Sequence, residues 1–298
     1  MSNLTSKTLA SLSLASDADL GTARAKTKGV ALVTGASSGF GRHIAESLSR
    51  AGFRTFGTSR SGRPGSEGVE MVALDVQDDD SVAACVEAVR AKAGAIHILV
   101  NNAGVLDVGP AEECSVSEVR ALFETNFFGV IRMTNAVLPE MRARRSGRII
   151  NIGSLAGLLP PPGEAAYAAS KFALEGYSEA LSIEVAPFGV KVSLIEPGFH
   201  KTGMGHGDGQ GGAEPSGSIR DYDKFREAVQ TSIARSLEGG GDPREVAEVV
   251  CRVVEAERPR LRYRVGSDAK WLPRLRKLLP ESLYLWGLRR EFGIDKIA

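Results

Sequence analysis

The chain has 298 residues and a formal net charge of +1, and 43% of its residues are hydrophobic while 24% are charged. This length supports one large hydrophobic core, and the near-zero charge excludes an overall attraction to nucleic acid or to an anionic membrane. Its three cysteines (Cys85, Cys114 and Cys251) are far apart, so they predict neither a disulfide framework nor a zinc site. We therefore expect a cytoplasmic protein that acts on a small molecule and holds no metal.

Residues 1–28 are rich in Ser, Thr and Ala and include Asp17 and Asp19. They lack the basic-then-apolar order of a secretory signal, so we expect a disordered leader, with a transit peptide as the alternative. No stretch of the chain approaches the ~18 apolar residues that a membrane-spanning helix needs. The sequence therefore predicts no membrane span.

From residue 30 onward, short apolar and β-branched runs alternate with longer segments of helical period. This alternation is typical of a doubly wound α/β fold of the Rossmann type, in which helices cover both faces of a parallel sheet. Seven strands are expected, at residues 30–33, 54–58, 70–74, 96–100, 148–152, 191–195 and 261–265. These elements predict a single domain over residues 29–267.

The first strand is followed by a glycine-rich turn that leads into a helical stretch, and its sequence is Thr34-Gly35-Ala36-Ser37-Ser38-Gly39-Phe40-Gly41. The glycines let the chain turn sharply, approach a pyrophosphate and pack the helix closely, while the helix N-terminus presents free N–H groups to an anion. The spacing differs from G-x-G-x-x-G, so a strand–helix turn that binds no ligand is the alternative.

The end of the second strand, about 20 residues after the glycines, is where NAD enzymes place an acidic residue on the ribose 2′-hydroxyl. Here the sequence has Ser59 at that position and Arg60 beside it. A carboxylate that would repel a 2′-phosphate is missing, and a guanidinium that can bind phosphate is present. We therefore predict NADP(H) over NAD(H); the alternative is that Arg60 is a solvated loop charge.

Further along the chain, Ser115 and Glu118 form the pattern of a capping box and predict the start of a long helix. Seven glycines fall between residues 203 and 217, after the sixth strand, which is too many for a packed element. They predict a mobile substrate loop over residues 199–222.

Tyr167 and Lys171 lie four residues apart in an alanine-rich stretch, so both side chains project from one helix face. A free phenol has a pKa near ~10, and a nearby ammonium lowers it, so we expect Lys171 to tune Tyr167 as an acid/base. Ser154 follows the fifth strand at the carboxyl edge of the sheet, where it can hydrogen-bond a substrate oxygen. Asn126, on a preceding helix, is expected to hold a water that links Lys171 to solvent. Each residue alone has a structural explanation, but their joint occurrence behind a phosphate loop favours catalysis.

With these motifs in order, the sequence resembles the short-chain dehydrogenase/reductase family over residues 28–267. The resemblance implies that Tyr167 donates or accepts the proton, that Ser154 polarises the carbonyl, that Lys171 holds the nicotinamide ribose, and that Asn126 completes a proton relay. One departure from the family pattern is His97, which stands where aspartate is usual and is expected to alter only local bonding.

The resemblance also implies the cofactor contacts: Asn101-Asn102-Ala103-Gly104 would stabilise the central sheet and touch the cofactor, Asp75 and Val76 would flank the adenine, and Pro197, Gly198 and Thr202 would bind the carboxamide. The full set of expected cofactor-binding residues is Gly35, Ser37, Ser38, Gly39, Phe40, Gly41, Ser59, Arg60, Asp75, Val76, Asn102, Ala103, Gly104, Tyr167, Lys171, Pro197, Gly198 and Thr202.

Within the family, Ser59-Arg60, the Ile-Glu-Pro-Gly run at residues 195–198 and the long C-terminal end look most like the branch of 17β-hydroxysteroid and retinol dehydrogenases. The resemblance implies an NADP(H)-dependent oxidoreductase that transfers a hydride between the nicotinamide and an apolar ketone or secondary alcohol, assembled as a homodimer or homotetramer. The alternatives are a non-catalytic NADP(H)-binding redox sensor on the same fold and a sugar-nucleotide epimerase, although the epimerase needs a longer C-terminal substrate domain.

Residues 268–298 form an amphipathic, basic extension. From Arg258 to the end there are eleven Lys and Arg residues against four acids, interleaved with Trp271, Trp286 and several leucines. Such a segment can cover an apolar cleft or lie on a membrane surface, and it can equally pack on the body of the protein.

Overall fold

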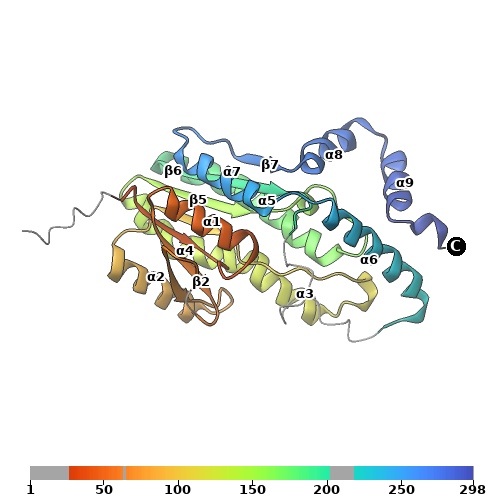
Figure 1. Ribbon diagram of the computed structural model, residues 1–298, viewed down its shortest axis with the longest axis horizontal. Helices are drawn as coiled ribbons and strands as arrows, with labels where there is room; N and C mark the ends of the chain where they lie inside the picture. Colours follow the sequence, from red (N-terminus) through yellow and green to blue (C-terminus); the bar gives the residue numbers. More distant parts are fainter. Residues whose placement is uncertain (1–26, 63–64, 202–217, 298) are drawn as a thin grey trace, which may run out of the picture.

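The structure is a computed structural model that describes residues 27–62, 65–201 and 218–297 (Figure 1). Most of the predicted leader and all of the glycine-rich run lie outside the described residues. Within them, seven strands form one parallel sheet: β1 Val30–Val33, β2 Arg54–Ser59, β3 Val69–Ala73, β4 Ile98–Asn101, β5 Gly147–Ile152, β6 Val190–Pro197 and β7 Arg262–Val265. The predicted fold and all seven predicted strands are confirmed.

The strand order is β3-β2-β1-β4-β5-β6-β7, so the chain reverses its direction across the sheet between β1 and β4. In the paired register Val33 lies opposite Val100, and the two strands end side by side. A crevice for a ligand forms where the strand order reverses, at the carboxyl ends of the strands. This topology therefore places the turn after β1 and the segment after β4 at one site.

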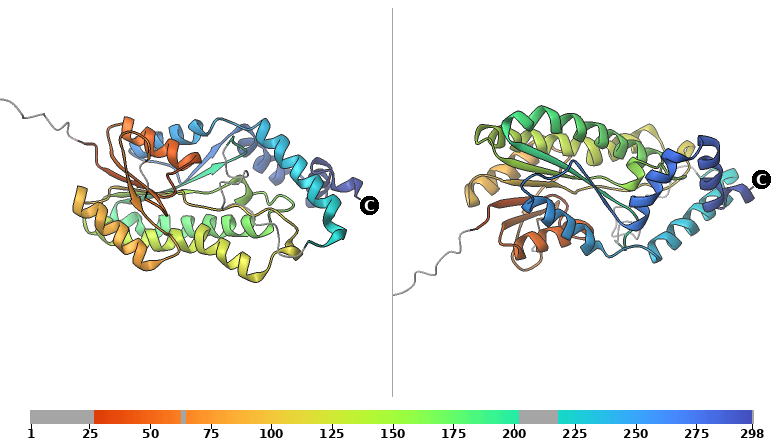
Figure 2. Two further views of the ribbon diagram at one scale, coloured as in Figure 1. Left: turned by 60° about the horizontal axis from the view of Figure 1, so that its bottom comes forward. Right: turned by 90° about the horizontal axis from the view of Figure 1, so that it is seen from above.

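Two helical layers cover the sheet, as Figure 2 shows. One layer contains α1 (Gly39–Arg50) and α7 (Pro243–Glu255), and the other contains α2 (Asp79–Ala93), α4 (Gly129–Ala143) and α5 (Ala165–Val185). Each layer buries its apolar stripe against one face of the strands, which is why β1 and β4 are buried on both sides. In α1 that stripe is Phe40, Ile44 and Leu48, spaced by four residues.

The predicted helix starting near Ser115 is present, with its capping box formed by Ser115 and Glu118. It runs as α3 (Val116–Phe123), continues through a π-helical turn (Glu124–Phe128) and joins α4. The extra residue in a π turn changes which side chains face the sheet. Short 3-10 turns occur at Ala111–Glu113, Leu155–Gly157, Ala186–Phe188, Arg220–Tyr222 and Ile294–Lys296.

The remaining helices, α6 (Asp223–Glu238), α8 (Ser267–Leu278) and α9 (Glu281–Glu291), gather at one end of the molecule (Figure 1). The Asp268 carboxylate accepts a hydrogen bond from the Phe199 backbone N–H at 2.7 Å, and Ala269 is fully buried. The C-terminal extension therefore packs onto the body beside the segment that follows β6. In the described part of the chain, no helix has the length and apolar character needed to cross a membrane.

Candidate active site

The turn between β1 and α1 has the shape that the glycines predict. Gly35 and Gly39 adopt left-handed backbone angles, with φ of +64° and +52°. Gly41 leaves no room for a side chain, because a Cβ there would stand 2.2 Å from the Gly35 carbonyl oxygen and 2.3 Å from Asn102 Nδ2. That amide nitrogen donates to the carbonyls of Thr34 and Gly35 at 2.9 and 3.0 Å, so Asn102 fixes the turn from the neighbouring strand.

A cavity of about 540 Å³ opens over this turn. Thirteen of the predicted cofactor-binding positions surround it or support its floor, and twelve of them line it directly: Gly35, Ser37, Ser38, Gly39, Phe40, Ser59, Arg60, Asp75, Val76, Asn102, Ala103 and Gly104. Gly41 is the thirteenth and lies beneath the turn. The cavity thus combines free backbone N–H groups at a helix start with an arginine at its edge, which fits an elongated phosphate-bearing ligand.

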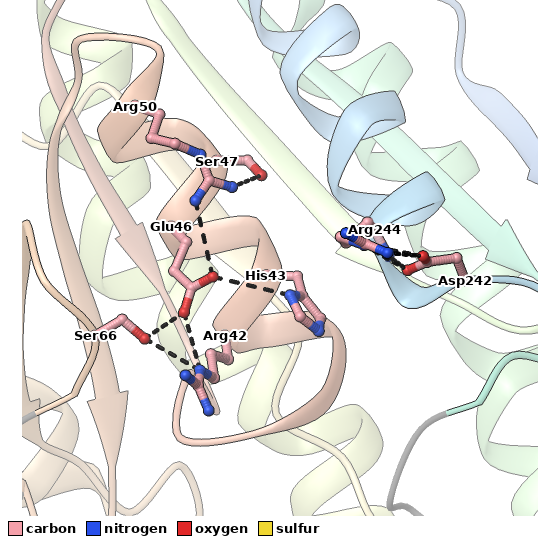
Figure 3. A network of polar contacts seen from close by, with 8 residues as sticks. All are labelled: Arg42, His43, Glu46, Ser47, Arg50, Ser66, Asp242 and Arg244. Atoms are coloured by element: carbon pink, nitrogen blue, oxygen red, sulfur yellow. Dashed lines mark hydrogen bonds and ion pairs between the residues drawn. The ribbon is translucent and has the colours of Figure 1, made fainter.

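Arg60 is exposed at that edge and has no ion pair with the described residues. A neighbouring arginine, Arg42, is already engaged: it donates to Glu46 Oε1 at 2.9 Å and to Ser66 Oγ at 3.1 Å (Figure 3). The Ser66 hydroxyl also binds Glu46, and this bond together with Arg42 holds the pKa of Glu46 below its usual value. The network ties α1 to the segment between β2 and β3. Among the described residues that line the cavity, Arg60 is the one that carries a positive charge.

Tyr167, Lys171 and Ser154 come together at the carboxyl edge of the sheet. Tyr167 and Lys171 lie on the first two turns of α5, with Lys171 Nζ 5.7 Å from the centre of the Tyr167 ring. The ammonium donates to the Ile152 carbonyl at 3.0 Å, at the end of β5. Ser154, two residues further, hydrogen-bonds the Tyr167 side chain, which is only 9% exposed.

The prediction that Lys171 lowers the pKa of Tyr167 is wrong for the protein without a bound ligand. Burial raises the pKa of Tyr167 to about 12, and the hydrogen bond to Ser154 lowers it by less. Burial also lowers the pKa of Lys171 to about 8. The sequence shows that the two side chains share a helix face, but it does not show that both are buried. Burial removes each group from water and disfavours its charged form.

Asn126 is also not placed as a simple helical residue, because it lies in the π-helical turn. Its Oδ1 accepts from the Val105 backbone N–H at 2.8 Å, and its Nδ2 donates to the Val105 carbonyl at 2.9 Å and to Ser170 Oγ at 3.2 Å. Asn126 therefore joins the segment after β4 to α5. A Cβ added at Gly104 would lie 3.2 Å from Asn126 Oδ1 and 3.9 Å from Lys171 Nζ, which shows how closely these groups approach.

A second cavity, of about 480 Å³, meets the first at Phe40, Asn102, Gly104, Val105 and Leu106. It contains Ser154, Tyr167 and Lys171 together with the predicted residues Pro197 and Gly198. Thr202 lies outside the described residues. The other walls were not predicted residue by residue: they come from α6 (Gln230, Ile233, Ala234, Leu237) and from the C-terminal extension (Leu272, Tyr284, Leu288, Phe292).

Two further residues at this cavity were not singled out from the sequence as site residues. His200 is 2% exposed, and its Nδ1 lies 2.9 Å from the Gly198 carbonyl while its ring meets Phe40 edge to face. Glu164 is 5% exposed and lines the cavity one turn before Tyr167. Among the residues that the structure describes, no three His, Cys, Asp or Glu side chains converge as a metal site would require. His97 accepts a hydrogen bond from the Val30 backbone N–H at 3.1 Å, which is a local contact.

Comparison with known proteins agrees with this geometry. The family model described as short chain dehydrogenase matches residues 29–211. A 3-ketodihydrosphingosine reductase of Bacteroides thetaiotaomicron is 39% identical over 267 residues, which cover 89% of this chain and 98% of that protein. The human 17-beta-hydroxysteroid dehydrogenase type 1 is 36% identical, with 89% of this chain and 86% of that protein covered.

Solved structures give the same picture. A short-chain dehydrogenase from Streptomyces avermitilis superposes with a TM-score of 0.74 at 37% identity, over 85% of this chain and 94% of that one. A short-chain dehydrogenase/reductase from Burkholderia phymatum, in complex with NAD, has a TM-score of 0.72 at 26% identity, with the same shares covered. A metagenomic short-chain oxidoreductase in complex with NADP has a TM-score of 0.62 at 30% identity, over 80% of this chain and 97% of that one.

Proposed function

This chain belongs to the short-chain dehydrogenase/reductase family, and on that basis we propose that it is an NADP(H)-dependent oxidoreductase that interconverts an apolar ketone and the corresponding secondary alcohol. The observation that carries the proposal is the Tyr167–Ser154 hydrogen-bonded pair beside Lys171, at the junction of the two cavities. A panel of ketones with NADPH, and of alcohols with NADP⁺, tests it directly by the absorbance change of the nicotinamide. A protein that binds NADPH but turns over no member of the panel would be the redox sensor instead.

In the reduction direction the chain's own residues have clear tasks. A bound nicotinamide would supply the hydride. Tyr167 and Ser154 would both hydrogen-bond the carbonyl oxygen, and Tyr167 would donate its proton to that oxygen as the alcohol forms. A pKa of about 12 keeps the phenol protonated at neutral pH, which is the state required of a proton donor. Lys171 would hold the cofactor ribose and, as an ammonium, stabilise the phenolate left behind.

The preference for NADP(H) rests on Arg60, and we predict that Arg60→Ala removes it. A charge-assisted pair with the 2′-phosphate is worth roughly 1.5–3 kcal/mol, so Kd for NADPH should rise about 10- to 100-fold while Kd for NADH changes little. Titration of both cofactors by fluorescence measures this. Arg50→Ala is the control, because Arg50 lies at the far end of α1 and pairs within that helix. Equal affinities for the two cofactors in the wild type would contradict the prediction.

An apolar substrate is supported by the walls of the second cavity. Leucines and aromatic rings from three separate segments surround the catalytic side chains, and several belong to the C-terminal extension. The relatives named for sphingoid, steroid and retinol substrates make long or polycyclic apolar ketones the first compounds to assay.

Removal of α9 should raise KM for large substrates much more than for small ones. A chain that ends at Leu279 loses Tyr284, Leu288 and Phe292 from the cavity wall, while Ser154, Tyr167 and Lys171 keep their places. We expect KM for a long-chain ketone to rise about tenfold or more, since each lost apolar contact is worth ~1–3 kcal/mol, with KM for a short ketone nearly unchanged. Steady-state kinetics with both ketones measures the difference. Equal losses for both, or a large fall in Tm, would show that α9 is needed only for the fold.

The outer surface of α8 and α9 also supports a peripheral contact with an anionic membrane. Exposed apolar side chains, including Trp271 (70%), Leu278 (82%) and Trp286 (53%), alternate with basic ones. Arg274 lies over the Trp271 ring at 5.5 Å, and Arg290 over the Trp286 ring at 5.4 Å. Aromatic and basic side chains together suit the headgroup region of a bilayer. Sedimentation with anionic vesicles, compared with neutral ones, measures this contact.

A homodimer or homotetramer is the assembly we propose, and its interface would include the outer face of α5. Phe128, Phe172 and Ile183 are 42, 43 and 71% exposed, on α5 and at the start of α4. Such side chains on a long helix are typical of a subunit contact. Light scattering measures the mass. A cytoplasmic location stays a prediction.

A further inference from the structure

Glu164 is a buried carboxylate for which the proposed reaction has no use. It lines the substrate cavity, is 5% exposed, and comes three residues before Tyr167 at the start of α5. Although it stands at the N-cap position of that helix, its side chain makes no capping bond. No hydrogen bond or ion pair joins its carboxylate to any other described residue.

The other buried carboxylates among the described residues are paired with arginines, and Glu164 is the exception among them. Glu113 binds Arg226, Glu196 binds Arg264 at 3.0 Å, and Glu175 binds Arg262 at 2.9 Å. An unpaired carboxylate in an apolar surrounding is strongly disfavoured, so such groups normally find a cation. Lys171 does not act as that cation, because no ion pair joins it to Glu164 and burial alone shifts the pKa of that carboxyl. Among the described residues no cation pairs with Glu164, so a cationic group bound in the cavity would supply the partner that these residues do not.

The place of the Glu164 carboxylate in the cavity indicates which kind of group could bind it. Glu164 and Tyr167 lie three residues apart and line the same cavity, and the negative charge of Glu164 adds to the rise in the pKa of Tyr167. A carbonyl oxygen held by Tyr167 and Ser154 would stand in the same cavity as Glu164. The rest of the cavity is lined mainly by apolar side chains of α6, α8 and α9. The cavity thus offers one anionic point next to the reaction centre and apolar walls elsewhere.

On the proposed ketone reduction, we propose that Glu164 binds a protonated amino group of the substrate, and hence that the substrate is a ketone with an amine beside its carbonyl and an alkyl chain beyond. Glu164 is then a specificity-determining residue: it accepts hydrogen bonds from the ammonium and thereby orients the neighbouring carbonyl oxygen toward Tyr167. Burial raises the pKa of Glu164 to about 7, and an ammonium in contact would lower it again and keep the carboxylate charged at neutral pH.

The test compares two ketones and three proteins. The ketones are a long-chain 2-amino-3-ketone and the same compound with hydrogen in place of the amino group. The proteins are the wild type, Glu164→Gln, and Glu227→Gln, which makes the same chemical change at an exposed position of α6. Glu164→Gln should lower kcat/KM for the amino ketone about 10- to 100-fold, as expected for loss of a charge-assisted pair, and leave the value for the neutral ketone within about twofold. Glu227→Gln should change neither.

A second measurement does not depend on turnover. Calorimetric titration with dodecylamine should give a Kd about 10- to 100-fold weaker for Glu164→Gln than for the wild type, and dodecanol should bind both proteins alike. If Glu164→Gln lowers kcat/KM equally for the two ketones, or if dodecylamine binds both proteins alike, Glu164 is not an amine site. Reduction of the neutral ketone alone, with no preference for the amine, would overturn this inference while the proposed reaction stands. Failure to reduce any ketone would instead overturn the proposed reaction.

Discussion

Tyr167→Phe is expected to lower kcat about 10²–10⁴-fold, the usual contribution of a general acid or base. The change removes one hydroxyl from a side chain that is already 9% exposed and hydrogen-bonded to Ser154, so the ring keeps its place while the proton donor is lost. Steady-state kinetics on the best ketone of the panel measures kcat. Because the phenol is only one of many groups around the cofactor cavity, Kd for NADPH should change less than about threefold.

The same helix provides the control for this change. Tyr177→Phe removes a hydroxyl from α5 at a half-buried position away from both cavities, and kcat should stay near the wild-type value. If Tyr167→Phe kept more than about a tenth of the wild-type kcat, another group would be the acid, and His200, the other buried titratable side chain at the cavity besides Glu164 and Lys171, would be the next to replace.

Gly41→Ala should have the second large effect, on cofactor binding and on the fold around it. The added Cβ would overlap the Gly35 carbonyl, in the turn after β1, and the side-chain amide of Asn102, which holds that turn from the segment after β4. Helix α1 must then move away from the turn, and the hydrogen bond from Asn102 to Gly35 is lost. Overpacking of this kind costs ~1–3 kcal/mol or more, so we expect Kd for NADPH to rise at least about tenfold, together with a lower Tm.

A glycine-to-alanine change at a second position shows whether the effect on Kd is specific to Gly41. Gly176 lies inside α5, and a Cβ there would meet no atom within 4 Å. Gly176→Ala should therefore leave Kd for NADPH unchanged, because this exposed position lines neither cavity. A Gly41→Ala protein with wild-type Kd and Tm would mean that the turn does not require the close approach seen in the structure.

The sequence predicts a structural feature well when neighbouring residues in the chain determine that feature. The strands were found because β-branched runs such as Val30–Val33 are buried on both faces and leave an unbroken apolar signal. The glycines after β1 and the spacing of Tyr167 and Lys171 are local as well, and both patterns are present in the structure. The bounds of the strands shift by one or two residues, since hydrogen bonding rather than composition sets where a strand ends.

The features that the sequence did not predict depend on distant segments. Glu164 follows a proline-rich stretch that looks like a solvated loop, yet it is buried and lines a cavity whose walls include α6 and the C-terminal extension. The pKa of Tyr167 was expected to fall and instead rises, for the same reason: spacing shows which groups are neighbours, whereas the loss of water depends on the whole cavity. The π turn at Asn126 arises within an apparently continuous helix and leaves no distinct signal.

The substrate cavity also makes the stability of the protein depend on pH in an unusual way. Glu164 has its pKa raised to about 7 from 4.5, so its contribution to stability is present below pH 4.5 and is lost as pH rises through 7. Lys171 has its pKa lowered to about 8 from 10.5, so its contribution is present above pH 10.5 and is lost as pH falls through 8. Both contributions are therefore smallest near neutral pH, where each buried group is at least partly charged. The contribution of these two groups to stability is therefore lowest at neutral pH, and a ligand that brings opposite charges to them should raise the melting temperature most there.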